Sequence, residues 1–469
     1  MSFKHFKYHL IFLSIFLTFL GCNQKPPGSQ TKPNVIIIYV DDMGYGDLGS
    51  YGCKDIPTPN IDMMAAKGVR FTDGYVSAPQ CAPSRVGLLS GKYQNRMGFE
   101  YNLRKDLAFS NGFPREEKTV GDLMKAQGYT TGIIGKWHMG RSPELHPNKR
   151  GFDEFFGTLY GNSNFIPPFN RFSKNEEGRK WDIQRDSKEV EEKEYLTDAF
   201  SREAIAFIER NRKKPFFLYL PYTSPHGPLQ ATDKYLKRFP NVEHPKRKIY
   251  AAMVSSLDDG VGRIMAKLKE CKIEENTLVF FISDNGGTTK SSYGDNGPLR
   301  AAKGSLNEGG IRVPFIMNWK GTLPAGVVDT RPVIQLDASA TAVNLAGGDI
   351  SDMNGVNLIP YLLKQKNEVP HKQLFWRIMS WKYESTGEPY QKATRRGDWK
   401  LVLTGKKWEL FNLKDDISEK NNLAAKHPEL VEELKASWDK WETTLQFPRF
   451  PANKIFPWER LKAEKEASK

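Results

Sequence analysis

Continuous apolar runs mark the predicted core strands of this chain. Residues 34–40 (NVIIIYV) and 277–283 (TLVFFIS) are rich in β-branched and aromatic residues and show no polar alternation. Such runs are typical of central strands that are covered on both faces. Three further runs predict strands, namely residues 129–135, 216–220 and 311–319. The pattern therefore predicts a large, mostly parallel sheet.

Stretches of helical character separate these runs. Residues 59–66 and 119–127 predict short helices, each followed by a glycine, and two longer helices are predicted at residues 195–210 and 248–269. Alternation of strands and helices is typical of an α/β fold. We therefore expect a doubly wound, mixed but mostly parallel sheet between two layers of helices.

The pattern changes at about residue 356. Short strands are predicted at the end of the chain, at residues 373–379, 390–394, 399–404 and 408–412, with turn signals at Gly397-Asp398 and Gly405-Lys406. Residues 428–445 predict an amphipathic helix on that sheet, and residues 450–469 a charged tail. We expect a catalytic-type domain over residues 34–355 and a small antiparallel-sheet-plus-helix subdomain, with the tail, over residues 356–469.

The first 22 residues have the features of a targeting segment. Lys4 and Lys7 precede an apolar run over residues 10–20, which is too short to span a bilayer comfortably. The run ends at Gly21-Cys22, which resembles a bacterial lipoprotein signal with Cys22 as the lipidated residue; an ordinary secretory signal is the alternative. Residues 23–33 would then be a tether. Both interpretations predict export to the cell envelope or periplasm, with membrane contact only through the anchor.

Charge and cysteine content add little by themselves. The formal net charge is +14, which favours an anionic partner or simply a solvated basic surface. We expect no nucleic-acid partner, because no binding motif is visible and no Lys/Arg run exceeds three residues. Besides Cys22 and Cys81, the chain has Cys53 and Cys271, which are either a disulfide pair or two free thiols.

Acidic residues directly follow the two longest apolar runs. Asp41 and Asp42 end the first run, and Asp284 and Asn285 end the second. Because the carboxyl ends of parallel strands share one edge of a sheet, we expect these side chains to meet. Adjacent carboxylates repel each other unless a cation lies between them. An oxygen-only cage of this kind suits Ca²⁺ or Mg²⁺ better than zinc.

One cysteine lies in an unusual local setting. Cys81 is part of the segment Cys81-Ala82-Pro83-Ser84-Arg85, and Pro83 suits the first position of a helix. The N–H groups and partial charge at that helix end would favour a thiolate or a bound oxyanion, with Arg85 one turn away. A buried, inert structural cysteine is the alternative.

The segment around Cys81 resembles the signature of type I sulfatases of the alkaline phosphatase superfamily, and further blocks in the family's order extend over residues 34–423. The resemblance implies enzymatic oxidation of Cys81 to formylglycine (3-oxoalanine) by a formylglycine-generating enzyme. It also implies one Ca²⁺ per chain, held by Asp41, Asp42, Cys81, Asp284 and Asn285. Its other blocks supply Lys136, His138, His226 and Lys303, and residues 396–400 in the C-terminal subdomain.

The resemblance also implies a mechanism. The hydrated aldehyde at position 81 attacks sulfur, with Asp284 taking its proton. Lys136 and Lys303 hold the sulfate oxygens, and His226 protonates the leaving oxygen, with or without help from Lys303. His138 then helps to expel the sulfate, and Arg85 orients the nucleophile.

The expected substrate is a sulfated polysaccharide or its oligosaccharides. Two other functions stay open on sequence alone: a phosphonate or phosphodiester hydrolase of the same superfamily, and a non-catalytic lipoprotein that binds sulfated glycan. Asn162 or Ser163 stands near the position of a serine common in the family. Residues 164–194 predict a long loop, either at the mouth of the active site or on the surface as an insertion.

Overall fold

The computed structural model describes residues 32–176, 178–380, 387–452 and 456–467. The predicted signal segment, Cys22 and almost all of the tether lie outside these ranges. Residues from Lys32 onward form one compact unit. Among the described helices, none combines the length and hydrophobicity needed to cross a bilayer.

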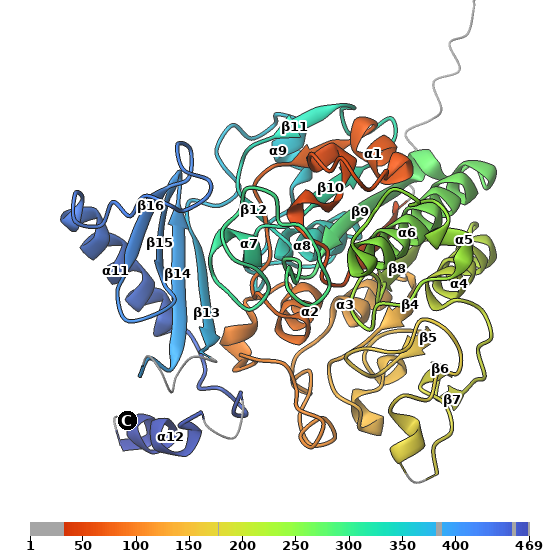
Figure 1. Ribbon diagram of the computed structural model, residues 1–469, viewed down its shortest axis with the longest axis horizontal. Helices are drawn as coiled ribbons and strands as arrows, with labels where there is room; N and C mark the ends of the chain where they lie inside the picture. Colours follow the sequence, from red (N-terminus) through yellow and green to blue (C-terminus); the bar gives the residue numbers. More distant parts are fainter. Residues whose placement is uncertain (1–31, 177, 381–386, 453–455, 468–469) are drawn as a thin grey trace, which may run out of the picture. The chain divides into compact units, whose positions relative to one another are not determined.

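A ten-stranded sheet forms the centre of the molecule, in the order β11-β2-β10-β9-β1-β8-β4-β5-β6-β7 (Figure 1). Strand β1 (Asn34–Val40) pairs in parallel with β8 (Phe216–Pro221) and β9 (Thr277–Ser283). The other members are β2 (Val69–Phe71), β4 (Thr130–Lys136), β5 (Glu154–Thr158), β6 (Ile183–Arg185), β7 (Lys188–Glu189), β10 (Phe315–Asn318) and β11 (Val327–Asp329). Because β10, β6 and β7 run antiparallel to their neighbours, the sheet is mixed, as predicted.

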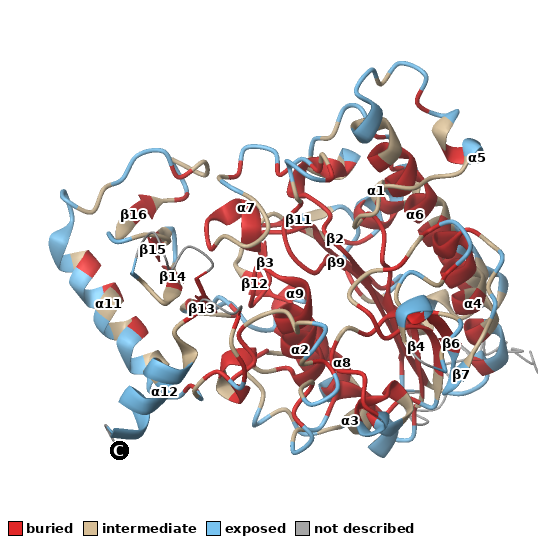
Figure 2. Ribbon diagram, turned by 60° about the horizontal axis from the view of Figure 1, so that its bottom comes forward, coloured by how far each residue is buried: buried red, intermediate tan, exposed pale blue. Residues whose placement is uncertain are grey.

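Helices cover both faces of this sheet (Figures 1 and 2). Ile36 and Ile38 of β1 belong to the core under one layer, whereas Val35 and Ile37 belong to the core under the other. This alternation explains the unbroken apolar run, since every second side chain meets a different helix layer. One layer contains α1 (Pro59–Ala66), α4 (Leu196–Asn211) and α6 (Pro245–Glu270), and the other contains α2 (Cys81–Ser90), α3 (Val120–Ala126) and α8 (Leu336–Leu345).

Shorter elements complete this part of the chain. A two-stranded sheet pairs β3 (Gly74–Tyr75) with β12 (Val333–Ile334). The short helices are α5 (Asp233–Leu236), α7 (Glu308–Ile311) and α9 (Ile359–Leu362). The 3₁₀ turns are η1 (Tyr45–Asp47), η2 (Gly49–Tyr51), η3 (Gln94–Met97), η4 (Pro143–Leu145), η5 (Pro147–Lys149), η6 (Ser173–Asn175) and η7 (Glu274–Asn276). The strand predicted at residues 311–319 is shorter than expected, because its first residue ends α7.

The C-terminal part forms the predicted antiparallel sheet. Its strands, in order, are β13 (Leu374–Met379), β14 (Tyr390–Arg396), β15 (Trp399–Leu403) and β16 (Glu409–Asn412), and α11 (Pro428–Glu442) packs on it (Figure 1). The expected charged tail differs from the structure, since it contains α12 (Trp458–Ala467) and a buried Phe450. The Phe450 ring meets that of Phe99 at a centroid distance of 5.2 Å, so apolar burial anchors the start of this segment.

Candidate active site

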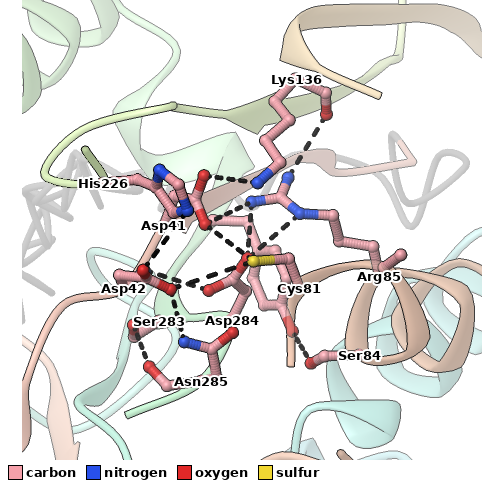
Figure 3. A network of polar contacts seen from close by, with 12 residues as sticks. Asp41, Asp42, Cys81, Ser84, Arg85, Lys136, His226, Ser283, Asp284 and Asn285 are labelled. Atoms are coloured by element: carbon pink, nitrogen blue, oxygen red, sulfur yellow. Dashed lines mark hydrogen bonds and ion pairs between the residues drawn. The ribbon is translucent and has the colours of Figure 1, made fainter. Parts of the chain in front are cut away.

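The ends of β1 and β9 bring the predicted carboxylates together. Val40 and Ser283 are partners in the parallel register, so Asp41 and Asp284 follow at neighbouring positions. The amide N of Asp42 donates to Asp284 Oδ1 over 3.2 Å, and Asn285 Nδ2 donates to Asp42 Oδ1 over 2.7 Å. All four side chains are buried, and they point toward one another in Figure 3.

Helix α2 places Cys81 against this edge. The helix begins at Cys81 itself, so Pro83 is its third residue. The sequence predicts Pro83 as the first residue of the helix, and this prediction is wrong by two positions. Proline is compatible with the third position because the first N–H groups of a helix have no partner within it. The Cys81 Sγ atom lies 3.3 Å from Asp41 Oδ1.

Arg85 is aimed at the carboxylates and is fully buried. Its Nε and Nη2 atoms both donate to Asp284 Oδ2, over 3.1 and 2.7 Å. Its Nη1 donates to the backbone oxygen of Lys136 over 3.3 Å. The guanidinium also lies 5.6 Å from the centre of the Tyr39 ring. Arg85 therefore connects α2 to the ends of β4 and β9.

Two lysines and a histidine complete the polar cluster (Figure 3 shows Lys136 and His226). Lys136, at the end of β4, reaches Asp41 Oδ2 over 2.6 Å. Lys303 reaches Asp42 Oδ1 over 2.5 Å and Cys81 Sγ over 3.0 Å. His226, which follows β8, holds Nε2 3.5 Å from Asp42 Oδ2, and its Nδ1 donates to the Gly227 carbonyl over 2.6 Å.

His138 lies in the wall of the same pocket as Cys81, His226 and Lys303. Its backbone has a φ of 61°, which turns the chain sharply after β4. Its Nδ1 atom is buried and has no hydrogen-bond partner among the described residues. Burial, reinforced by Lys136, lowers the pKa of His138 well below its usual value, which favours the neutral form of the ring.

The environment of Cys81 corrects one expectation. Burial, together with the Asp41 carboxylate, raises the pKa of the Cys81 thiol to about 12, against the opposing influence of Lys136 and Lys303. The helix N-terminus therefore does not make Cys81 a thiolate, because desolvation and a like charge outweigh it. The unmodified side chain is a neutral thiol at physiological pH and a poor nucleophile.

The paired carboxylates carry opposite pKa shifts. Burial and the Asp41 charge raise the pKa of Asp284 to about 7. Burial opposes ionisation of Asp41 as well, but Lys136 and the other cations keep the pKa of Asp41 well below its usual value. Two neighbouring buried carboxylates such as Asp41 and Asp284 ionise together only if further positive charge is supplied.

The oxygen atoms of this cluster fit a hard cation. Single ligand atoms of Asp41, Asp42, Cys81 and His226 all lie within 4.8 Å of one another. The Oδ1 atom of Asn285 is buried and accepts no hydrogen bond among the described residues, which is the state of an amide oxygen ready to ligate a cation. Carboxylate and amide oxygens suit Ca²⁺ or Mg²⁺. His226 was not among the predicted metal ligands, and only its position after a core strand indicated that it would lie here.

The active-site pocket has a volume of about 260 Å³ and opens over Cys81. Asn162 lines it, whereas Ser163 is buried outside the lining, so of these two residues only Asn162 faces the pocket. Sequence reasoning assigned no role to four further polar lining residues on loops, for which no local signal exists: Asn102, Lys105, Arg141 and Tyr160.

An aromatic and basic wall bounds the pocket. The rings of Tyr160 and Phe172 stack at 4.6 Å, and the Arg141 guanidinium lies 4.8 Å from the Tyr160 ring centre. Phe172 comes from the predicted loop over residues 164–194, so that segment reaches the mouth of the pocket. The same segment also contributes β6 and β7 to the large sheet, so it is not wholly a loop.

The other described cysteines are chemically separate from this site. Cys53 and Cys271 are free thiols, so the disulfide alternative does not apply to them.

Comparisons with known proteins agree with this geometry. A family model described as Sulfatase matches residues 33–348, and a second, described as N-sulphoglucosamine sulphohydrolase, C-terminal, matches residues 302–443. The chain is 37% identical to dog N-acetylgalactosamine-6-sulfatase over 359 residues, which covers 72% of this chain and 67% of the relative. It is 30% identical to the uncharacterized sulfatase YdeN of Escherichia coli K12, over 87% of this chain and 85% of the relative.

Solved structures show the same similarity. Ps i-CgsB, in complex with k-i-k-neocarrahexaose, has a TM-score of 0.85 and 38% identity, and the match covers 93% of this chain and 98% of that chain. The PsFucS1 sulfatase from Pseudoalteromonas sp. has a TM-score of 0.75 and 27% identity, over 88% of this chain and 90% of that chain. The phosphonate monoester hydrolase SpPMH from Silicibacter pomeroyi shares the fold at a TM-score of 0.66 and 17% identity, over 88% of this chain and 96% of that chain.

Proposed function

The chain belongs to the sulfatase family and hydrolyses sulfate esters of saccharides, and we propose that its substrate is a sulfated galactan fragment such as a neocarrahexaose. The observation that carries this proposal is the site itself, where Cys81 lies between two lysines and a cluster of buried carboxylates. The choice of sugar is supported by Ps i-CgsB, which was solved in complex with k-i-k-neocarrahexaose and is 38% identical over a match that covers 93% of this chain.

We propose that Cys81 acts only after its conversion to formylglycine by a formylglycine-generating enzyme. An aldehyde hydrate at this position has a second hydroxyl that can release the bound sulfate, and a thiol has none. The neutral state of the unmodified thiol supports this proposal, because such a thiol would attack sulfur poorly.

Side chains of the pocket then divide the remaining tasks. Lys136 and Lys303 bind sulfate oxygens and offset the charge that spreads over them. The proton for the leaving alcohol oxygen comes from the Lys303 ammonium group or from Nε2 of His226 in its protonated form, because the neutral ring carries its only proton on Nδ1. The ring of His138, whose Nδ1 atom has no hydrogen-bond partner among the described residues, accepts a proton during release of the sulfate.

We propose Ca²⁺ as the resident metal ion, held by Asp41, Asp42, Asp284, Asn285 and residue 81. A bound divalent cation would polarise the sulfate group and lower the cost of negative charge on its oxygens. Arg85 keeps Asp284 in place from the opposite side. A phosphonate-hydrolase activity is less well supported, because the similarity to SpPMH is one of fold and the donors here are mainly oxygens.

The decisive experiment combines mass spectrometry with a sulfate-release assay. The chain is produced together with a formylglycine-generating enzyme, and the peptide containing Cys81 is expected to be lighter than its unmodified form. Sulfate release is then measured on sulfated neocarra-oligosaccharides, on 6-O-sulfated N-acetylgalactosamine and on a phosphate diester. We expect turnover on the first, and a marked preference for the second would overturn the choice of sugar.

Two variants test the nucleophile. Cys81→Ser should release at most one equivalent of alcohol and then stop, because its sulfate ester has no second hydroxyl to expel the sulfate. Cys81→Ala should release none. Sustained turnover by Cys81→Ser would refute the formylglycine mechanism.

We further propose that the protein is exported and anchored to the cell envelope through a lipid on Cys22, as its first 22 residues suggest. Metabolic labelling with a radioactive fatty acid tests this proposal. If the protein stays unlabelled, and is released from the membrane to the same extent as a Cys22→Ser variant, no lipid anchor is attached.

A further inference from the structure

A second cavity lies directly beside the active-site pocket. This cavity, which we call the second groove, has a volume of about 690 Å³. Its wall consists of residues 288–291, 300–305 and 307, together with Gln391 and Thr404 of the C-terminal part. Lys303 lines both cavities, and its Nζ atom lies 3.0 Å from Cys81 Sγ. The two cavities therefore meet at a residue that is expected to bind the sulfate group.

The lining of the second groove is basic and rich in hydrogen-bond donors. It contains Lys290, together with Arg300 and Lys303, which pair with Glu409 and Asp42 behind the lining, and no Asp or Glu is found among its described lining residues. The other polar members are mainly hydroxyl and amide side chains. Such a lining favours a ligand that carries both hydroxyl groups and anionic groups.

Two polar atoms in this lining lack partners. The Nδ2 atom of Asn307 is buried without a hydrogen bond in the described structure, although the residue is only 3% exposed. Its Oδ1 atom accepts from Ser305 Oγ over 3.0 Å, so the unused edge of the amide is a donor. The Oγ1 atom of Thr288 is likewise buried and unpaired. Unpaired buried polar groups are costly, so they indicate a ligand that satisfies them.

The C-terminal sheet holds the second groove in shape. Gln391 of β14 donates to the Gly304 carbonyl over 2.9 Å and accepts from the Leu306 amide over 3.3 Å. Arg300 donates to the Glu419 carbonyl over 3.0 Å and pairs with Glu409 of β16. The loop that carries Lys303 is thus fixed from both sides, and a preorganised surface of this kind binds a chain at lower entropic cost.

We propose that the second groove binds the sulfated sugar units that continue the substrate chain beyond the sugar being desulfated. The inference rests on the proposed function and specifies its mode of action. The active-site pocket, with Tyr160 and Arg141, takes one part of the chain, and the second groove, which meets the pocket at Lys303, takes the next part. An enzyme that binds the chain beyond the reacting sugar in this way acts on internal sulfate groups.

The test compares substrates of different length. The readout is the ratio of kcat/KM for a sulfated neocarrahexaose to that for a sulfated monosaccharide, so that a general loss of activity cancels. Lys290→Gln removes a charge from the exposed rim, and Asn307→Leu removes the unpaired donor. Each should lower the ratio about tenfold, which corresponds to one lost charge-assisted contact. Asn307 is the N-cap residue of α7, so Asn307→Leu can fail to fold. In that case Lys290→Gln alone decides the test.

Lys213→Gln is the matched control. Lys213 is exposed and precedes β8. It therefore lies at the N-terminal ends of the strands, whereas the site lies at their C-terminal ends, so loss of its charge should leave the ratio unchanged. Equal ratios in Lys290→Gln, Asn307→Leu and the wild type would overturn the proposal.

Product analysis gives an independent answer. Tandem mass spectrometry of the partly desulfated hexasaccharide should show that an internal sulfate is lost first, and loss from the terminal sugar alone would contradict the proposal. If the formylglycine-containing enzyme releases no sulfate from any saccharide, the proposed function fails. The second groove is then judged by calorimetric binding of the hexasaccharide to Cys81→Ala, which must weaken about tenfold in Cys81→Ala with Lys290→Gln.

Discussion

At the scale of single residues, the site is a balance of buried charges. Asp41 and Asp284 are both fully buried, and they pair with Lys136 and Arg85, while Lys303 pairs with the neighbouring Asp42. Arg85 places two nitrogen atoms on a single oxygen of Asp284, a geometry that depends on its planar fork. A side chain with the same charge but without the planar guanidinium group would therefore not replace Arg85.

Replacing Arg85 by lysine tests this geometry. Arg85→Lys keeps the charge but loses the fork, so we expect kcat/KM for sulfate release to fall on the order of 100-fold. Arg263→Lys, on the exposed surface of α6, is the control and should have wild-type kinetics. Wild-type kinetics for Arg85→Lys would show that positive charge alone is sufficient.

Removal of the metal ion tests the oxygen cage. Incubation with the calcium chelator EGTA should abolish sulfate release, because the carboxylates of Asp41 and Asp284 would repel each other without the ion. Added Ca²⁺ should restore activity and raise the melting temperature of the metal-free protein. Restoration by Zn²⁺ but not by Ca²⁺ would argue against the oxygen-ligand site.

At the scale of elements, the site lies at the C-terminal ends of four neighbouring strands. The sheet places β9, β1, β8 and β4 side by side. Strand β4 ends at Lys136, and Asp284, Asp41 and His226 follow β9, β1 and β8. The parallel register keeps these ends level, which is why residues far apart in sequence converge. Gly135, next to Lys136, lets β4 approach the backbone of β8 closely, since a Cβ there would lie 2.0 Å from the Pro221 oxygen.

Gly135→Ala tests how tightly this edge is built. The residue has a φ of 133° and no room for a side chain, so we expect a loss of about 1–3 kcal/mol in unfolding free energy, with a lower kcat because Lys136 is displaced. Gly128→Ala is the control, because Gly128 also has a positive φ, of 82°, but open space around it. Chemical denaturation and sulfate release measure the two effects. Equal stability and activity in the two variants would exclude a steric role for Gly135.

At the scale of the whole molecule, a buried ionic cluster connects the C-terminal sheet to the rest. Lys400 of β15 is fully buried and contacts Glu308 over 2.8 Å and Glu419 over 3.0 Å. Glu308 begins α7, five residues after Lys303, so the cluster connects the C-terminal sheet with the active-site loop. The predicted boundary at residues 355 and 356 therefore separates two sequence patterns, while polar contacts cross it.

Lys400→Met removes the buried cation that pairs with Glu419 and leaves Glu308 paired with Arg312 alone. We expect it to lower the free energy of unfolding by about 3–5 kcal/mol, because an uncompensated buried charge is costly. Lys435→Met removes an exposed ion pair with Glu432 on α11 and should cost less than about 1 kcal/mol. Denaturant unfolding followed by fluorescence compares the two. Similar losses would mean that the buried cluster contributes no more than a surface pair.

The local pattern of the sequence was sufficient for much of the fold. The runs at residues 34–40 and 277–283 coincide with β1 and β9, and the helix at residues 59–66 coincides with α1. These elements are predictable because continuous burial and the placement of proline and glycine leave local signals. The same signals located Asp41 and Asp284 at strand ends, where a parallel sheet brings them together.

Other properties depended on the tertiary structure. The neutral Cys81 thiol follows from burial beside Asp41, which outweighs the helix end that the sequence indicated. The position of Asn307 beside Lys303, and the support of both by the C-terminal sheet, likewise has no local signal. The chain by itself determined which segments are strands and helices, and which reactive residues end them. Only packing decided how far each charge is removed from water and which distant loops close around it, because desolvation and contact depend on neighbours that are remote in sequence.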